Sequence, residues 1–174
     1  GPFAVGSAAD GPVVTSAPGT VFNLSGCTGF AVSPSVLITA KHCGVTSALP
    51  LISMTGARPK VVKVVDYPDA DVQAVVSDAS DLSPFAVGGV AVGTTAQVFG
   101  YGRSRTDSAG AVSMRRADLG AAKAPQGHVF DIEVNGSTGS ACQGDSGAPI
   151  VQGGRAVGLV SSGDGPECGV TAVN

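Results

Sequence analysis

The sequence predicts an all-β fold, on the evidence of its turn residues, its strand-forming segments and its lack of helical periodicity. The chain has 174 residues, of which 26 are Gly and 11 are Pro. These residues separate short segments rich in Val, Ala, Thr and Ser, a composition that favours strands joined by turns. No stretch of about a dozen residues carries apolar residues at helical spacing without an interrupting Gly or Pro. Many short strands of this kind are typical of a sandwich or a barrel.

Six segments carry the clearest strand signal, because each is rich in apolar or β-branched residues and is bounded by turn residues. In chain order they are Ser35–Thr39, Lys60–Val65, Val72–Val76, Ala96–Gly100, His128–Val134 and Ala156–Ser161.

A seam at Asp81–Gly89 divides these strands into two groups. Pro84 and the pair Gly88-Gly89 interrupt the pattern there, as expected between two packed lobes. We therefore expect an N-terminal lobe over residues 3–84 and a C-terminal lobe over 85–174. No fixed-period repeat is present in the sequence, which disfavours solenoids and propellers.

Composition excludes several function classes. Apolar residues make up 43% of the chain, enough to bury a core, whereas only 13% are charged and the formal net charge is -3. This charge balance gives no sign of the basic surface that binds nucleic acid or an anionic membrane. No apolar run approaches the roughly 18 residues of a membrane-spanning helix. We expect a soluble chain whose signal peptide, if it is exported, has been removed; Gly1-Pro2 is typical of a cleaved tag.

The 4 cysteines permit two disulfides in three connectivities, and their even number suits an oxidising compartment. Zinc sites use closely spaced Cys or His pairs, whereas these cysteines are scattered. We expect no metal and no cofactor.

The segment Cys142–Pro149 carries the strongest chemical signal. A nucleophilic serine must present its hydroxyl on a turn, and the glycines on both sides of Asp145-Ser146 let the backbone bend there. The N–H groups of Gly144 and Ser146 can then stabilise a developing oxyanion. An ordinary surface turn is the alternative, because Gly, Asp and Ser are common turn residues. The segment Ile38–Cys43 favours catalysis, since it places His42, one of only 2 histidines, at the end of an apolar strand.

Together these stretches resemble the chymotrypsin family of serine proteases. The likeness covers Cys27–Phe30, Val36–Cys43 and Gly144–Gly147, in the family's order of histidine before serine. Phe99–Gly102 is similar to the family's Gly-Trp-Gly turn, and Gly158–Gly163 to its substrate-binding strand.

The resemblance implies two packed six-stranded antiparallel Greek-key β-barrels with the active site in the cleft between them. It implies a monomeric serine endopeptidase that forms an acyl-enzyme on a peptide or protein substrate. The short intervals between motifs resemble compact secreted bacterial members. By analogy Cys27 pairs with Cys43 and Cys142 with Cys168, and each such bridge contributes about 3 kcal/mol.

The family also supplies an aspartate that orients the histidine, and three residues compete for this role. The family places it just before an apolar strand, which Asp71 in Asp71-Val72-Gln73-Ala74 fits best. Asp69 lies in a turn-like phrase, and Asp66 fits least well.

The remaining assignments concern specificity and the second histidine. The resemblance places Ser140 at the floor of the specificity pocket and Ser161, Ser162 and Gly163 along its wall. A serine at the floor argues against a preference for Lys or Arg. We expect His128 to be structural or solvated. The basic residues after the Gly-Tyr-Gly turn are expected to be mostly solvated, with one able to reach Asp145; they are Arg103, Arg105, Arg115 and Arg116.

Two other functions compete with the protease. A protein of the same fold can use its cleft only to bind a partner, although such a role places no demand on Ser, His and Asp. An esterase or acyl transferase is the third possibility. Casein turnover that depends on His42 separates the binding protein from the protease, and the ratio of ester to peptide hydrolysis separates the third.

Overall fold

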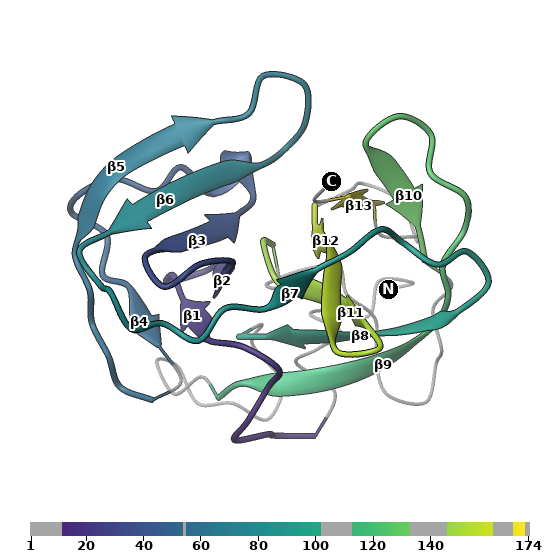
Figure 1. Cartoon of the computed structure of the whole chain (residues 1–174), viewed down its shortest axis with the longest axis horizontal. Coiled ribbons are helices and arrows are strands. Elements are labelled where there is room, and N and C mark those ends of the chain that lie inside the picture. The colour runs from purple at the N-terminus through teal and green to yellow at the C-terminus, as the bar shows by residue number, and fades with distance from the viewer. Residues whose placement is uncertain (1–11, 54, 102–112, 133–145, 162–168, 173–174) are drawn as a thin grey trace.

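The prediction of an all-β class is confirmed. We analysed a computed structural model that describes residues 12–53, 55–101, 113–132, 146–161 and 169–172, the last four by their backbone only. These residues form thirteen strands and one turn of 3₁₀ helix, with no α-helix among them. Figure 1 shows the strands gathered into two lobes, the first in purple to blue and the second in teal to yellow.

The first lobe is a six-stranded antiparallel sheet in the order β4-β1-β2-β3-β6-β5. The fourth strand returns to lie beside the first, which is the Greek-key arrangement. The single 3₁₀ turn, η1 (Lys41–Cys43), follows the third strand. The strands are β1 (Val21–Asn23), β2 (Thr28–Ala31), β3 (Val36–Thr39), β4 (Ile52–Ser53), β5 (Val61–Asp66) and β6 (Gln73–Ser77).

The second lobe repeats this arrangement in a sheet ordered β10-β13-β12-β11-β8-β9. A bridge between Ala122 and Ile132, just past β9 and β10, joins the two ends of the sheet and closes the barrel. A short seventh strand, β7, runs parallel to β12, in addition to the six antiparallel strands expected. The strands are β7 (Ala86–Val87), β8 (Thr95–Gly100), β9 (Arg115–Ala121), β10 (Val129–Asp131), β11 (Pro149–Gln152), β12 (Arg155–Val160) and β13 (Gly169–Ala172).

The N-terminal segment of the described chain lies against the second lobe, not the first. Val13 forms a bridge with Arg115, and the N–H of Val14 donates to the carbonyl of Met114 at 3.0 Å. The chain therefore crosses between lobes before β1 begins. The lobe boundary expected between residues 84 and 85 stays a prediction.

All six segments predicted to be strands contain one. The predicted segments correspond to β3, β5, β6, β8, β10 and β12, with bounds that agree to within two residues wherever the chain is described. The last two residues of His128–Val134 lie outside the described residues.

An apolar cluster of buried residues joins the two lobes. It combines Phe30 and Ala40 of the first lobe with Phe99 and Leu159 of the second, all at most 5% exposed. Phe85, in the segment that connects the lobes, meets Phe30 edge to face with ring centroids 5.6 Å apart. Because Ala40 immediately precedes η1, this shared core fixes the base of the turn that carries His42.

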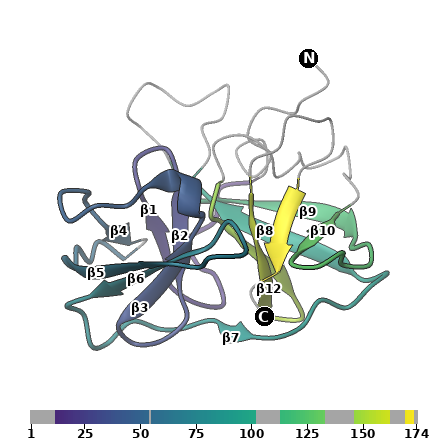
Figure 2. The ribbon, with the colours of Figure 1, turned by 90° about the horizontal axis from the view of Figure 1, so that it is seen from above.

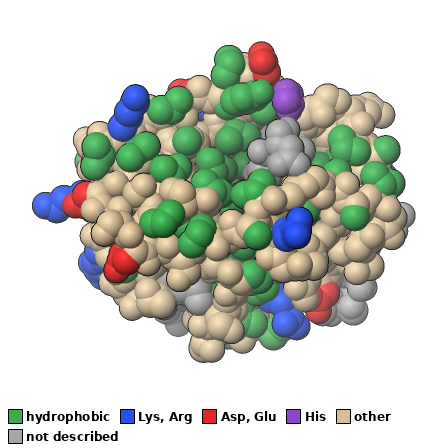
Figure 3. Space-filling view, in the orientation of Figure 1, with side chains coloured by type: hydrophobic (Ala, Val, Ile, Leu, Met, Phe, Trp, Pro, Cys, Tyr) green, Lys and Arg blue, Asp and Glu red, His purple; other side chains and the backbone are tan. Residues whose placement is uncertain are grey.

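The surface shows no concentration of one charge sign on the face seen in Figure 3, where Lys and Arg side chains alternate with Asp and Glu. Figure 2 shows the lobes side by side, with η1 close to their boundary. Among the residues that the structure describes, no helix has the length and apolar character needed to cross a membrane.

Candidate active site

The turn η1 presents His42 at the end of β3. The backbone is extended at Ala40 (φ -73°, ψ 137°) and turns at Lys41–Cys43. Gly44 ends the turn in the left-handed region (φ 61°), where glycine carries no Cβ penalty. The disulfide between Cys27 and Cys43 ties the turn to the residue before β2. The histidine therefore sits on a short, cross-linked turn.

Asp71 binds His42 through both oxygens of its carboxylate. The backbone N–H of His42 donates to Oδ1 at 2.9 Å, and Nδ1 of the imidazole lies 2.6 Å from Oδ2. An ionised carboxylate can only accept, so the proton of this contact belongs to Nδ1. In the neutral imidazole the lone pair is then on Nε2, which is the state required of a general base.

The surroundings of Asp71 lower its pKa. Burial acts in the opposite direction and would raise the pKa by itself. The hydrogen bonds from the His42 ring, the His42 backbone and Ser161, together with the charge of His42, outweigh that effect. The carboxylate therefore remains ionised at neutral pH and can orient the imidazole.

Ser161, directly after β12, supplies a contact that the sequence did not reveal. Its hydroxyl donates to Oδ2 of Asp71 at 2.8 Å, the same oxygen that contacts the His42 ring. Because Ser161 belongs to the second lobe and Asp71 to the first, this bond connects the lobes at the candidate site. The family resemblance by itself implies for Ser161 only a place along the substrate-binding strand.

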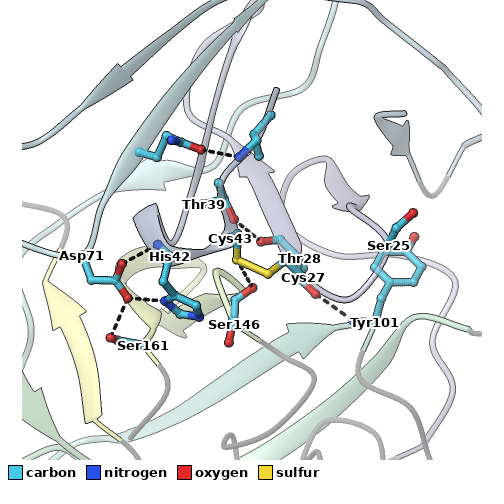
Figure 4. The surroundings of a disulfide bond; sticks show 12 residues. Ser25, Cys27, Thr28, Thr39, His42, Cys43, Asp71, Tyr101, Ser146 and Ser161 are labelled. Carbon is cyan, nitrogen blue, oxygen red and sulfur yellow. Dashed lines mark hydrogen bonds and ion pairs between the residues drawn. A yellow bond between two sulfur atoms is a disulfide. The ribbon is translucent and has the colours of Figure 1, made fainter. Parts of the chain in front are cut away.

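Ser146 lies on the side of the His42 ring opposite Asp71, as Figure 4 shows. It is 7% exposed, and its carbonyl accepts the N–H of Thr28 at 2.8 Å. The Sγ atom of Cys43 lies 3.8 Å from the same carbonyl oxygen. This is a packing contact and not a hydrogen bond, because a disulfide sulfur carries no proton. A ring nitrogen of His42 lies within 4.8 Å of the same disulfide's sulfurs, so both residues border one disulfide.

Gly147 is the residue that lets the serine loop approach the histidine turn. Its φ is 86°, and a Cβ there would lie 2.1 Å from the carbonyl oxygen of Thr28 and 2.2 Å from Oγ1 of Thr39. Its N–H donates to the carbonyl of Val160 at 2.7 Å. Only glycine allows this backbone to touch the first lobe while it is bonded to the second.

The competing aspartates have other positions. Oδ1 of Asp66 accepts a hydrogen bond from Nε2 of Gln73 at 2.7 Å, which gives Asp66 a role inside the sheet. Asp69 is exposed in the loop that leads to Asp71. Within the described part of the chain, the geometry brings Asp71 to His42.

His128 makes a contact between the lobes. Its ring meets that of Tyr67 edge to face, with centroids 5.5 Å apart. The carbonyl of Tyr67 accepts a hydrogen bond from Nζ of Lys41 at 2.7 Å, so His128 is linked to the residue next to His42. Arg115 and Arg116 are half-buried in β9, and Nε of Arg116 lies 3.3 Å from Oδ1 of Asp118.

The rest of the predicted site lies outside the described residues. This applies to the oxyanion donor Gly144, the acidic residue Asp145 and the second predicted disulfide. It also applies to most of the specificity pocket and to two of the arginines. The residues are Ser140, Cys142, Gly144, Asp145, Ser162, Gly163, Cys168, Arg103 and Arg105.

The cluster formed by Cys27, His42 and Cys43 does not fit a metal ion. Their ligand atoms lie within 4.8 Å of one another, but both sulfurs are joined in the disulfide. Metal binding needs thiolates, which these cysteines do not offer while bonded to each other.

The comparison with protein families agrees with this geometry. The Trypsin family model matches residues 13–173, nearly the whole chain. The chain belongs to the trypsin family. The family resemblance noted in the sequence is thereby confirmed, and the two barrels are those of its fold. Membership of the trypsin family supports a serine protease-like function. No curated protein shows significant similarity to the chain.

Proposed function

We propose that this trypsin-family protein is a serine endopeptidase in which Ser146 is the nucleophile, His42 the general base and Asp71 the orienting carboxylate. The observation that carries the proposal is the contact between Nδ1 of His42 and Oδ2 of Asp71 at 2.6 Å, with Ser146 beside the same imidazole. A nucleophile, a base and a group that orients the base are the elements of acyl transfer.

The reaction proceeds in two halves. His42 takes the proton of the Ser146 hydroxyl through Nε2 as Oγ bonds to the scissile carbonyl carbon. The oxyanion is stabilised by the N–H groups of Gly144 and Ser146, each worth about 10²–10³ in rate. The imidazolium gives its proton to the departing amine, which leaves an acyl-enzyme. Water then attacks with His42 again as base, and the proton returns to Ser146 as the acid is released.

Asp71 contributes in both halves. Its two hydrogen bonds to His42 fix the ring and its tautomer, and its negative charge stabilises the imidazolium. The lowered pKa of Asp71 keeps that charge in place at neutral pH. No metal or cofactor takes part in this proposal.

The substrate is proposed to be a peptide or protein with an apolar or aromatic side chain in the specificity pocket. By the family resemblance, Ser140 would stand at the pocket floor, where it offers no charge to pair with Lys or Arg, and Gly163 would stand at the pocket mouth, where it has no side chain to narrow the opening. Secretion is supported by the disulfide between Cys27 and Cys43, since such bonds persist in oxidising compartments. The proposed bacterial source rests on the short intervals between His42, Asp71 and Ser146, which resemble those of bacterial members of the family. We propose that the secreted protein acts as a monomer.

Hydrolysis of casein and of a peptide library by the purified protein and by Ser146→Ala tests this function. We expect turnover in the parent protein and none above background in Ser146→Ala. The control is Ser47→Ala, which removes an exposed hydroxyl and should leave turnover unchanged. Turnover that survives Ser146→Ala would overturn the proposal. A folded protein that cleaves nothing would instead favour the partner-binding function, and hydrolysis of esters alone would favour an esterase.

A further inference from the structure

Thr28 uses three polar groups to connect the parts of the candidate site. It is fully buried at the start of β2. Its N–H donates to the carbonyl of Ser146 at 2.8 Å, and its own carbonyl accepts the hydroxyl of Thr39 at 2.8 Å. Its side-chain Oγ1 accepts the N–H of Tyr101 at 3.1 Å. Figure 4 shows Thr28 between Ser146 and Tyr101.

These contacts hold two second-lobe residues, one just before β11 and one just after β8. Ser146 leads into β11, and Tyr101 follows β8, which pairs with β11 in the register Ile150↔Val98. The backbone of Thr28 therefore fixes the beginning of β11, while its hydroxyl fixes the end of β8. A single first-lobe residue is therefore bonded to the segment before β11 and to the residue after β8.

The carbonyl of Thr28 connects this residue to the strand that precedes His42. Thr39, which donates to the Thr28 carbonyl, is the last residue of β3 and lies three positions before His42. Gly147 packs directly on this bond, since a Cβ there would lie within 2.2 Å of both of its oxygens. The distance between the serine loop and the histidine turn is consequently set where Thr28 and Thr39 meet.

We infer that the hydroxyl of Thr28 is a positioning group for Ser146. By holding the end of β8, which pairs with β11, the hydroxyl fixes where the serine lies relative to the imidazole. The inference rests on the proposed function. The side chain does not touch the substrate; it acts through the backbone of Tyr101 and the strand beside Ser146. Burial raises the pKa of Tyr101 to about 12, so its phenol stays neutral and adds no charge beside Thr28.

Thr28→Val separates the hydroxyl from the backbone contacts. Valine has nearly the same shape, keeps the N–H and the carbonyl, and leaves the N–H of Tyr101 without its acceptor. We expect kcat to fall by about tenfold or more while KM changes by less than about threefold, because a small displacement of the nucleophile affects the chemical step more than binding. Thr28→Ser restores the acceptor and should return kcat to within about threefold of the parent.

Thr20→Val is the matched control. Thr20 also uses its N–H, its carbonyl and its Oγ1, the last to accept the N–H of Ser83 at 3.2 Å. None of these bonds involves Ser146, Tyr101 or Thr39. The control should lose its bond to the Ser83 N–H, as Thr28→Val loses its bond to the Tyr101 N–H, yet keep the parent kcat. Equal losses of kcat in both variants, or a folded Thr28→Val with parent kcat, would overturn the inference.

Amide hydrogen exchange provides a readout that does not depend on activity. In Thr28→Val the amides of Tyr101 and Gly147 should exchange at least about tenfold faster than in the parent, and in Thr20→Val they should not. Unchanged protection at Gly147 would overturn the inference, because faster exchange at Tyr101 alone follows directly from the loss of its acceptor. If the parent protein cleaves nothing, the proposed function fails, and the exchange rates still decide whether Thr28 positions the serine loop.

Discussion

The carboxylate of Asp71 accepts the backbone N–H of His42 with one oxygen and contacts Nδ1 of the same residue with the other, at 2.9 and 2.6 Å. The first bond fixes the turn that carries the histidine, and the second fixes the orientation of the ring. One side chain therefore determines both the position and the tautomer of the base, which makes Asp71 the most informative residue to change.

Asp71→Asn should lower kcat by about 10⁴, the loss that follows when an amide replaces this carboxylate and favours the wrong imidazole tautomer. Steady-state hydrolysis of a peptide substrate measures it. Asp69→Asn is the matched control, because it alters an exposed carboxylate two positions earlier in the same loop. Equal losses in the two variants would contradict the assignment of Asp71.

The acid stability of the protein should depend on Asp71. Its folded pKa lies below the ordinary value of 3.8, so ionisation of Asp71 stabilises the fold above that value. This stabilisation is lost as the pH falls through the lowered folded pKa. Urea unfolding of the parent and of Asp71→Asn between about pH 6 and pH 2 measures it. The difference in unfolding free energy should shrink toward low pH; a difference that grows on acidification would contradict the lowered pKa.

Ser161→Ala should lower kcat by about tenfold, because the carboxylate of Asp71 loses a hydrogen bond that fixes it. Separate determination of kcat and KM distinguishes this role from a direct substrate contact of the side chain, which would mainly raise KM. Ser77→Ala is the control, since it removes a hydroxyl bonded at 2.9 Å to the carbonyl of Ser35, within the first lobe. An effect of Ser161→Ala on KM alone would show that its hydroxyl serves substrate binding.

Gly147→Ala should destabilise the protein by about 2–5 kcal/mol or prevent folding, because a left-handed backbone strain adds to a steric clash. The added Cβ would lie 2.1 Å from the Thr28 carbonyl. Gly153→Ala is the control: its φ is 57°, but no atom lies within 4 Å of the added Cβ, so only about 1–2 kcal/mol is expected. Thermal unfolding compares them, and equal losses would show that the close approach at Gly147 is not required.

Loss of the disulfide between Cys27 and Cys43 should cost about 3 kcal/mol, the value for a closed loop of about 15 residues; their sequence separation is 16. The double variant Cys27→Ala/Cys43→Ala, compared with the parent by urea unfolding, measures this cost. The catalytic rate should fall as well, since Cys43 lies next to His42 and packs on the Ser146 carbonyl. A double variant with parent stability and rate would contradict the structural role of the bond.

Strands with an apolar, β-branched composition could be predicted from the sequence, whereas others could not. β3 and β6 consist mainly of Val, Ile, Leu and Thr or Ala, and both were predicted. β9 reads Arg-Arg-Ala-Asp-Leu-Gly-Ala and was missed, because Ala, Asp and Gly are depleted in strands. Its pairing with β8 and the burial of Ala117 and Leu119 decide its conformation.

In the candidate site, too, some residues could be predicted from the sequence and others could not. His42 and Ser146 stand in motifs whose residue order has a chemical reason, so the sequence alone pointed to them. Thr28 and Ser161 act through contacts with residues 118 and 90 positions away along the chain, Ser146 and Asp71. No local pattern signals such a contact, since it exists only after two lobes have packed.

The central claim is that His42 activates Ser146, and labelling with a fluorophosphonate tests it most directly. Intact mass and peptide mapping should find one adduct, on Ser146, in the parent protein, and its formation should be abolished or slowed by orders of magnitude in folded His42→Ala. An adduct on another residue, or undiminished labelling of Ser146 without the imidazole, would contradict the account.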